Sequence, residues 1–404
     1  MKILNPFAIV LLFSALAFSC TQRMDEPEQV ETEKMLGYCV EKVQKTVVNL
    51  SPNDSLPRNI YPGQTQWNKV GIHDWTSGFW PGILWYAYEA SGDSAILEAA
   101  QNFTAPLKGV LDVAVSDHDL GFQLYNSFGN GFRLVDDSTY HYAVLTAADS
   151  LATLYNPKVG TTLSWPSQVK KMNWPHNTII DNMINLELLF YAAKNGGDQH
   201  LYDIAVKHAE TSMHTLIRPD YTIYHVAVFD TVDGQFIKGV THQGYADDSM
   251  WARGQGWGIY GYTMCYRETG KLEFLETAQK LADVFLERLP EDGIPYWDFD
   301  DPSIPDAPKD ASAACVAASA MLELSEFMTD ETVKLKYRNA AVSLLAKLSS
   351  PEYLSGDTNQ AFLLHSTGHK PKGSEIDASI IYADYYYLEA LLRLSKIERG
   401  IKLY

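Results

Sequence analysis

The sequence predicts an all-α protein, an (α/α)6 barrel of six helical hairpins with a short β-hairpin in a rim loop. A hairpin pattern recurs along the chain: a polar or aromatic start, an apolar helix, a Gly/Asp/Asn turn and a second helix. The first helix of each pair is apolar nearly all round, whereas the second alternates a charged face with an apolar one. These two properties are expected of an inner and an outer layer of helices.

Six starts of the pattern are visible, and six pairs that close on themselves form a barrel. They lie near Trp75, Tyr140, Ile180, Trp251, Asp310 and Ala378. An open solenoid is the alternative. The intervals vary by tens of residues and include a long insert at 221–248, which argues against short regular repeats.

The insert carries the predicted β-hairpin. YTIYHVAVF and GQFIKGVT are β-like and are separated by the turn DTVD. No βαβ pattern, GxGxxG or GxxxxGK[ST] motif occurs, so the sequence gives no sign of a nucleotide-binding fold.

Charge and composition restrict the function. The chain has 404 residues, of which 46% are hydrophobic and 12% aromatic, which is enough to form a large globular core. Its net charge of −18 argues against nucleic acid and anionic lipid as partners. An anionic carbohydrate remains compatible, because a few buried arginines and oriented amides hold a carboxylate whatever the overall charge.

The first residues predict export. Residues 1–19 contain Lys2 and an apolar run from Ile9 to Phe18, which is too short for a mature transmembrane helix. Cys20 follows directly, so we predict a lipoprotein signal with a lipid anchor at Cys20, and simple secretion is the alternative. Residues 20–34 are predicted to be a tether and residues 35–404 a single catalytic domain in the periplasm. No sequence feature specifies an oligomeric state.

No metal or other cofactor is expected. The remaining cysteines, Cys39, Cys265 and Cys315, form no CxxC pair and are predicted to be buried small hydrophobes. The histidines are dispersed, and neither HExxH nor an EF-hand loop occurs. A GxSxG elbow is also absent, which argues against a serine hydrolase.

Two polar clusters stand at predicted starts of inner helices. Trp75 lies in HDWTSGFWPG, where aromatic faces suit the wall of a sugar pocket or simply a packed core. Asp119 lies in SDHDLGF, and Asp181 begins an apolar helix, where an aspartate is usually only a cap. The functional alternative is a pair of carboxylates facing a substrate, with pKa values separated by burial and mutual repulsion from the ordinary ~3.9.

A third cluster is WARGQGWG, with His225 and Gln243 before it. Arg253 and Trp257 are four residues apart and therefore share a helix face. A guanidinium fork beside a flat ring suits a uronate, which has a carboxylate to clamp and a ring to stack. The alternative is a cation–π pair that seals a helix end.

From Gly37 to Tyr404 the chain resembles the unsaturated glucuronyl hydrolases of glycoside hydrolase family 88. The resemblance rests on five segments in register: HDLGF, IIDNMINLELL, DDSMWARGQGWGIYGY, PKDASAA and ASIIYADYYYLEALLR. One departure is Gly256, where the family pattern has alanine more often.

The resemblance implies an (α/α)6 barrel and a hydration reaction on acidic, glycosaminoglycan-type oligosaccharides. The substrate is the 4,5-unsaturated hexuronate that polysaccharide lyases leave at a non-reducing end. Members of the family protonate C4 and add water at C5, after which the hemiketal collapses and the glycosidic bond opens. By position, Asp181 is the general acid/base, and Asp119 holds ring hydroxyls and keeps Asp181 protonated.

The same resemblance implies the substrate-binding residues. His225 and Gln243 lie near the reacting carbons, and the sugar is held or stacked by Trp75, Trp251, Arg253 and Trp257, with Ser379 or Ser374 sharing the carboxylate clamp. Three alternatives remain: the related unsaturated rhamnogalacturonyl hydrolases, an ordinary inverting glycosidase acting on saturated uronides, and a non-catalytic helical glycan-binding lipoprotein.

Overall fold

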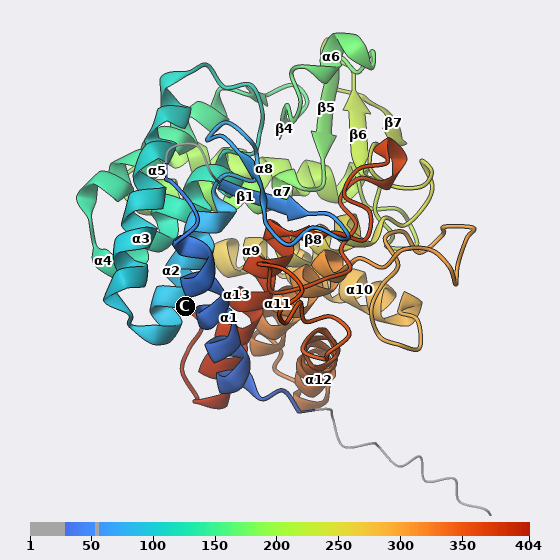
Figure 1. Cartoon of the computed structure of the whole chain (residues 1–404). Helices are drawn as coiled ribbons and strands as arrows, with labels where there is room; N and C mark the ends of the chain where they lie inside the picture. The colour runs from blue at the N-terminus through green and yellow to red at the C-terminus, as the bar shows by residue number, and fades with distance from the viewer. Residues whose placement is uncertain (1–28, 53–55) are drawn as a thin grey trace, which may run out of the picture.

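The barrel is closed by a ring of six inner helical segments. The computed structural model describes residues 29–52 and 56–404, so the predicted export signal and Cys20 lie outside the described residues. Each segment packs against the next, and α13 packs against α2, which confirms the closed barrel (Figure 1). In order they are α2 (Phe79–Ser91), the π-helix η2 (Gly121–Gly129) continued by α4 (Asn130–Val135), α7 (Asn182–Lys194), α9 (Ala252–Thr269), α11 (Ala311–Glu326) and α13 (Ile381–Glu398).

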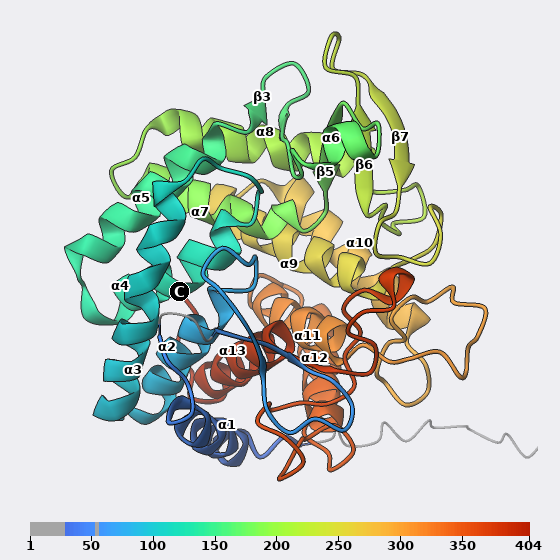
Figure 2. The same ribbon diagram turned by 45° about the horizontal axis from the view of Figure 1, so that its top comes forward.

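An outer layer of helices covers the ring, one behind each inner segment (Figure 2). These are α3 (Ser94–Thr104), α5 (Ser138–Ala152), α8 (Gln199–Thr215), α10 (Leu272–Arg288), α12 (Glu331–Leu348) and α1 (Thr32–Val47). Shorter helical turns lie between them at η1 (Ala105–Asp112), α6 (Gln168–Lys171) and η3 (Lys370–Lys372).

Two of the predicted hairpins are wrong in detail. Tyr140 lies in the first turn of the outer helix α5, and the inner segment of that pair is formed by residues 121–135. A π-helix has more residues per turn than an α-helix, so its apolar positions do not follow the 3.6-residue period. The helix predicted after Ala378 is α13, but its outer partner is α1 from the other end of the described chain.

Small β-sheets lie at the rim of the barrel. The predicted hairpin is confirmed as β6 (Val226–Phe229) and β7 (Phe236–Val240), and the sequence did not reveal a third antiparallel strand, β5 (His176–Ile179), on the other side of β6. A second sheet joins β1 (Leu56–Ile60), β2 (Asn68–Val70) and β8 (Ser379–Ile380). A two-stranded ladder pairs β3 (Tyr155–Asn156) with β4 (Thr161–Thr162).

Four buried rings meet in the barrel interior. We call them the aromatic layer: Phe79, Phe122, Trp257 and Tyr386. Their centroid separations around the layer are 5.4, 5.5, 5.3 and 6.2 Å, which closes a circuit of ring contacts. The rings come from α2, η2, α9 and α13 and pack against one another across the interior of the barrel.

The three cysteines are free and buried within the described chain, as predicted. No helix in the described part of the chain is long and apolar enough to cross a membrane.

Helix α11 is buried along its whole length except for its last residue, and its small side chains let α9, α12 and α13 approach closely. We expect Ala317→Leu to lower the free energy of unfolding by about 1–3 kcal/mol, because added methylenes overpack a filled core. The matched control Ala95→Leu lies on the exposed face of α3 and is expected to change it by less than about 0.5 kcal/mol. Denaturant unfolding checks both variants, and equal stability of the two would contradict close packing around α11.

Candidate active site

The inner helices bring the predicted residues together at their N-terminal ends. Asp119 lies two residues before η2, Asp181 immediately precedes α7, and Trp251 and Arg253 lie at the start of α9. Asp119 and Asp181 are only 8% and 9% exposed. A cavity of about 230 Å³ opens beside Asp119 and Trp75.

Asp181 occupies a cap position but does not act as a cap. Its side chain accepts no hydrogen bond from α7, and its Oδ2 atom is buried without a hydrogen-bond partner in the described structure. Other helix-capping aspartates do accept backbone N–H bonds, namely Asp93, Asp137, Asp198, Asp310 and Asp330. The capping alternative for Asp181 therefore fails, and its carboxyl group is free for chemistry.

Burial gives the carboxyl groups unusual pKa values. It raises the pKa of Asp181 to about 7, and the charge of Asp117 adds to the rise. Arg253 and Trp257 lower the same pKa, but their effect is smaller than that of burial. Burial also raises the pKa of Asp119 well above its ordinary value, with further contributions from Asp117 and Asp181. Desolvation is therefore the main cause for Asp181, and the predicted repulsion from Asp119 is not among its largest causes. Three such carboxyl groups cannot all ionise, so the cluster keeps a proton near neutral pH.

His225 faces Asp181 as a neutral hydrogen-bond donor. Its Nδ1 atom accepts two backbone N–H bonds, from His242 at 3.1 Å and Gln243 at 3.0 Å, so this nitrogen carries no proton. Burial lowers the pKa of His225 well below its usual value, which keeps the ring neutral. The proton therefore sits on Nε2, which points toward Asp181 Oδ2 at 3.7 Å.

Asn185 fixes the loop that carries Asp119. Its Oδ1 atom accepts the Phe122 backbone N–H at 3.0 Å, so its Nδ2 atom is the one that donates to His118 Nδ1 at 3.3 Å. The His118 proton consequently lies on Nε2, 3.5 Å from Asp119 and 3.7 Å from Asp117. Asn185 lies one turn after Asp181 on α7, so one helix positions both carboxylates.

The group Asp117, His118 and Asp119 has the residue types of a metal site, with ligand atoms within 4.8 Å of one another. The donor set does not fit a metal, because the Asn185 bond leaves His118 Nε2 protonated, and a ligating imidazole nitrogen must be unprotonated. We therefore describe the reaction with protein groups alone.

Arg253 connects three walls of the site. It is 2% exposed and donates to Asp310 Oδ2 at 2.6 Å and to the carbonyls of Thr367 and Gly368 at 2.7 and 2.6 Å. Its guanidinium lies over the rings of Trp251 and Tyr382, at 4.6 and 5.2 Å. Most of its donors are thus committed within the protein, which favours a role in holding the rim loop, and the carboxylate clamp stays a prediction.

The remaining predicted residues divide into two groups. Trp75 packs on Tyr382 at 5.2 Å and Gln243 donates to the Gly368 carbonyl at 3.3 Å, which places both at the wall. Trp257 lies in the aromatic layer, and Ser379 is buried in β8 with its hydroxyl bonded to Asn359 at 3.0 Å. Because the Trp257 and Ser379 side chains are both buried, the structure does not favour direct contact of either with the sugar. Their binding roles also stay predictions.

Sequence reasoning gave no role to several residues that build the site. His118 lies in the motif HDLGF and Tyr382 lies in ASIIYADYYYLEALLR, so their place in these motifs was the available signal. Trp165 contacts His225 and His242 at ring distances of 5.7 and 5.2 Å, and nothing in its surrounding sequence marked it.

A closed helical barrel with neighbouring buried carboxyl groups and aromatic walls at one rim defines a class of protein, the all-helical glycoside hydrolases. Residues 39–402 match the model of Glycosyl Hydrolase Family 88. The chain therefore belongs to glycoside hydrolase family 88 and is an enzyme of the unsaturated glucuronyl hydrolase type.

Individual relatives agree with this assignment. The unsaturated glucuronyl hydrolase of Formosa agariphila is 41% identical over 402 residues, covering 97% of this chain and 98% of its own. The unsaturated chondroitin disaccharide hydrolase of Streptococcus pyogenes serotype M1 is 38% identical and covers 82% of this chain and 84% of its own. The crystal structure of an unsaturated glucuronyl hydrolase specific for heparin has a TM-score of 0.86 at 40% identity, covering 91% of this chain and 98% of that one.

Asn185→Leu tests the positioning of the carboxylates. We expect kcat/KM to fall about 10- to 100-fold and the pH profile to move, because Phe122 N–H and His118 Nδ1 lose their partner and Asp119 shifts. The control is Asn195→Leu, an exposed position at the other end of α7. Reduced stability alone would lower the melting temperature and leave the pH profile in place, which would contradict a positioning role.

Proposed function

We propose that the enzyme removes the non-reducing-end 4,5-unsaturated uronic acid from lyase-generated acidic oligosaccharides by hydrating the C4=C5 double bond. One observation carries the chemistry: Asp181 is a buried carboxyl group with a pKa near 7 and a free Oδ2 atom, at the start of an inner helix. Such a group holds a proton at neutral pH and can both donate and retrieve it.

In the proposed reaction, Asp181 transfers its proton to C4 of the enol ether. The resulting carboxylate takes a proton from a water molecule, whose oxygen bonds to C5, so one water is added and Asp181 returns to its protonated form. The hemiketal at C5 then collapses and the glycosidic bond opens without a sugar–enzyme ester. The protonated Nε2 atom of His225 lies 3.7 Å from Asp181 Oδ2 and has no partner in the described structure, so it is available to donate a hydrogen bond to Asp181 or to the sugar.

The site offers an anionic sugar a locally positive environment. The N-termini of the inner helices converge there, and each carries a partial positive charge. Arg253 adds a guanidinium, which is paired with Asp310 at 2.6 Å. The helix N-termini oppose the net charge of −18 at this position.

Glycosaminoglycan fragments are the proposed substrate class. One relative acts on unsaturated chondroitin disaccharides, and a structural neighbour is specific for heparin. The alignment with the first covers 82% of this chain, and the second has the same barrel over 91% of it. This similarity supports the same kind of terminal sugar here. The rhamnogalacturonyl and binding-only alternatives gain no such support.

We further propose that the enzyme is exported and held at a membrane by a lipid on Cys20, in the periplasm. The support is the apolar run from Ile9 to Phe18, which the small residue Ser19 separates from that cysteine. Extracytoplasmic lyases would then supply its substrate.

Asp181→Asn tests the acid. We expect turnover of unsaturated chondroitin disaccharide to fall by at least about 10²–10⁴-fold, because an amide cannot deliver a proton. Loss of the ultraviolet absorbance of the C4=C5 bond measures the reaction. The control Asp149→Asn changes an exposed aspartate on α5 and should keep parental turnover. A folded Asp181→Asn variant with near-parental turnover would remove Asp181 from the mechanism.

The pH profile tests the protonation state. A raised carboxyl pKa means that the acid form persists to higher pH, so turnover should be retained below pH 7 and lost above it. We expect kcat to fall about tenfold per pH unit on the alkaline side, measured from about pH 5 to about pH 9. A kcat that rises through pH 7 would show that the ionised form is the active one.

A further inference from the structure

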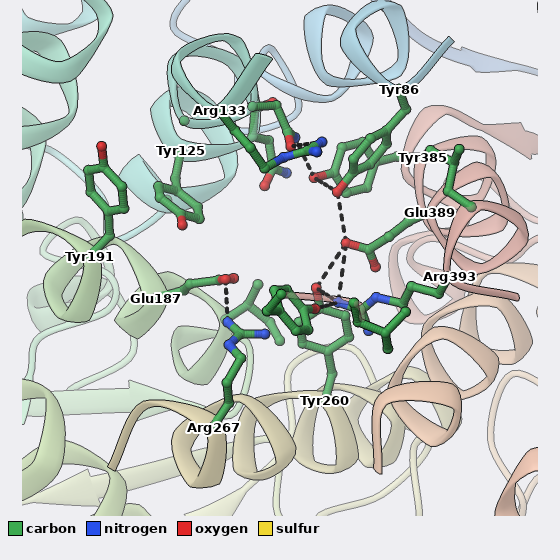
Figure 3. Close-up of a pocket in the computed structure, with 18 of the residues that line it drawn as sticks. Tyr86, Tyr125, Arg133, Glu187, Tyr191, Tyr260, Arg267, Tyr385, Glu389 and Arg393 are labelled. Carbon is green, nitrogen blue, oxygen red and sulfur yellow. Dashed lines mark hydrogen bonds and ion pairs between the residues drawn. The ribbon is translucent and has the colours of Figure 1, made fainter. Parts of the chain in front are cut away.

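A second cavity, of about 490 Å³, opens at the other end of the barrel (Figure 3). It is lined by residues of α2, η2, α4, α7, α9 and α13, most of them beyond the first turn of each helix, and by Leu403 and Tyr404. Glu187 lies six residues beyond Asp181 on α7, which is about 9 Å along the helix axis. No residue lines both this cavity and the cavity beside Asp119 and Trp75, and Tyr386 of the aromatic layer lines this one, so the two cavities are separate.

The charged groups of this second cavity neutralise one another. Arg133 and Lys396 both pair with Glu89, at 2.6 and 2.9 Å, and Lys194 pairs with Glu268 at 2.7 Å. The remaining ion pairs join Arg267 to Glu187, Glu268 and Glu323, and Arg393 to Glu323 and Glu389. Glu323 lies outside the cavity lining, and burial raises the pKa of Glu187 to about 7. Each of the five cations nevertheless has an acidic partner, so none is left unpaired to hold a uronate or a sulfate.

Uncharged hydrogen-bonding groups remain free there. Asn126 is 7% exposed, lines the cavity, and its Nδ2 atom has no hydrogen-bond partner in the described structure. The Tyr125 hydroxyl, from the preceding residue of η2, makes no hydrogen bond to another described residue. A buried amide without a partner is costly, so a ligand with hydroxyl groups would be stabilised at this position.

Tyrosine rings supply flat surfaces on both sides. Tyr125 and Tyr191 lie 5.5 Å apart, and Tyr86 and Tyr385 lie 5.0 Å apart, with the cavity between the pairs (Figure 3). Such rings stack on the C–H faces of sugars while their hydroxyls bond to sugar oxygens. The volume is within the range of about 300–1,000 Å³ that is typical of small-molecule sites.

We propose that this cavity is a second, non-catalytic binding site for a neutral mono- or disaccharide. The stacking rings, the unpartnered amide and the absence of an unpaired cation in the lining favour an uncharged polyhydroxylated ligand. The ligand enters past Arg133 and Lys194, whose side chains are 42% and 46% exposed at the rim.

Two variants of the full chain test the site, with N-acetylgalactosamine and cellobiose as probes in ligand-observed NMR and calorimetry. The parent should bind a probe at one saturable site, and Tyr125→Ala should bind it at least about tenfold more weakly through loss of a stacking ring. Asn126→Leu should abolish binding and raise the melting temperature, because leucine leaves no buried polar group unsatisfied. Turnover of the unsaturated disaccharide should stay parental in both variants.

The matched control is Tyr142→Ala, which removes a 67% exposed tyrosine from the outer helix α5 and should leave binding unchanged. Absence of binding by the parent to both probes would overturn the proposal. A second result would also overturn it: both cavity variants still bind the probe, and the unsaturated disaccharide displaces it. The probe would then lie in the catalytic cleft.

Discussion

The buried guanidinium of Arg253 is the interaction on which the site depends. A charge that is almost completely removed from water requires partners, and this one finds them on α11 through Asp310 and on the rim loop through two carbonyls. The rings of Trp251 and Tyr382 cover its faces, so the N-terminal ends of α9, α11 and α13 are tied to one point. The same charge lowers the pKa of Asp181, and without it burial would raise that pKa further. Arg253 therefore both holds these helix ends together and influences the pKa of Asp181.

Burial without capping is what separates Asp181 from an ordinary helix start. Asp310 and Asp330 use their carboxylates to bond helix N–H groups, and neither has to serve a substrate from that position. Asp181 leaves its Oδ2 atom unbonded in a low-dielectric wall, which costs folding free energy but holds a proton where the sugar would lie. His225 and His118 stand beside this cluster as neutral donors because backbone amides and Asn185 fix their tautomers. The hydrogen bonds that decide which histidine nitrogens carry a proton are thus made away from the substrate.

The sequence predicted those features that local patterns encode. The barrel followed from apolar inner and amphipathic outer helices. Contiguous motifs pointed to Asp119, Asp181 and Arg253, which the structure brings to the same end of the barrel, while their catalytic roles stay predictions. The inner segment at 121–135 was missed because a π-helix breaks the expected period. Asn185 was missed as a positioning residue because its partners Phe122 and His118 lie more than sixty residues away in sequence. Trp257 was expected to face the sugar, yet a helix face shared with Arg253 does not reveal whether a neighbouring helix already covers it.

The two ends of the same six inner helices explain why one barrel has two chemically different compartments. At the N-terminal end the helix dipoles present positive charge, which favours an anionic uronate. At the opposite end the dipoles present negative charge, and cations occupy last turns of the inner segments: Arg133, Lys194, Arg267 and Lys396. Those cations are needed by the dipoles and by the facing glutamates, so none is left to hold an acid group. A ligand of the second cavity must therefore be recognised by rings and neutral hydrogen bonds, which is the chemistry of an uncharged sugar.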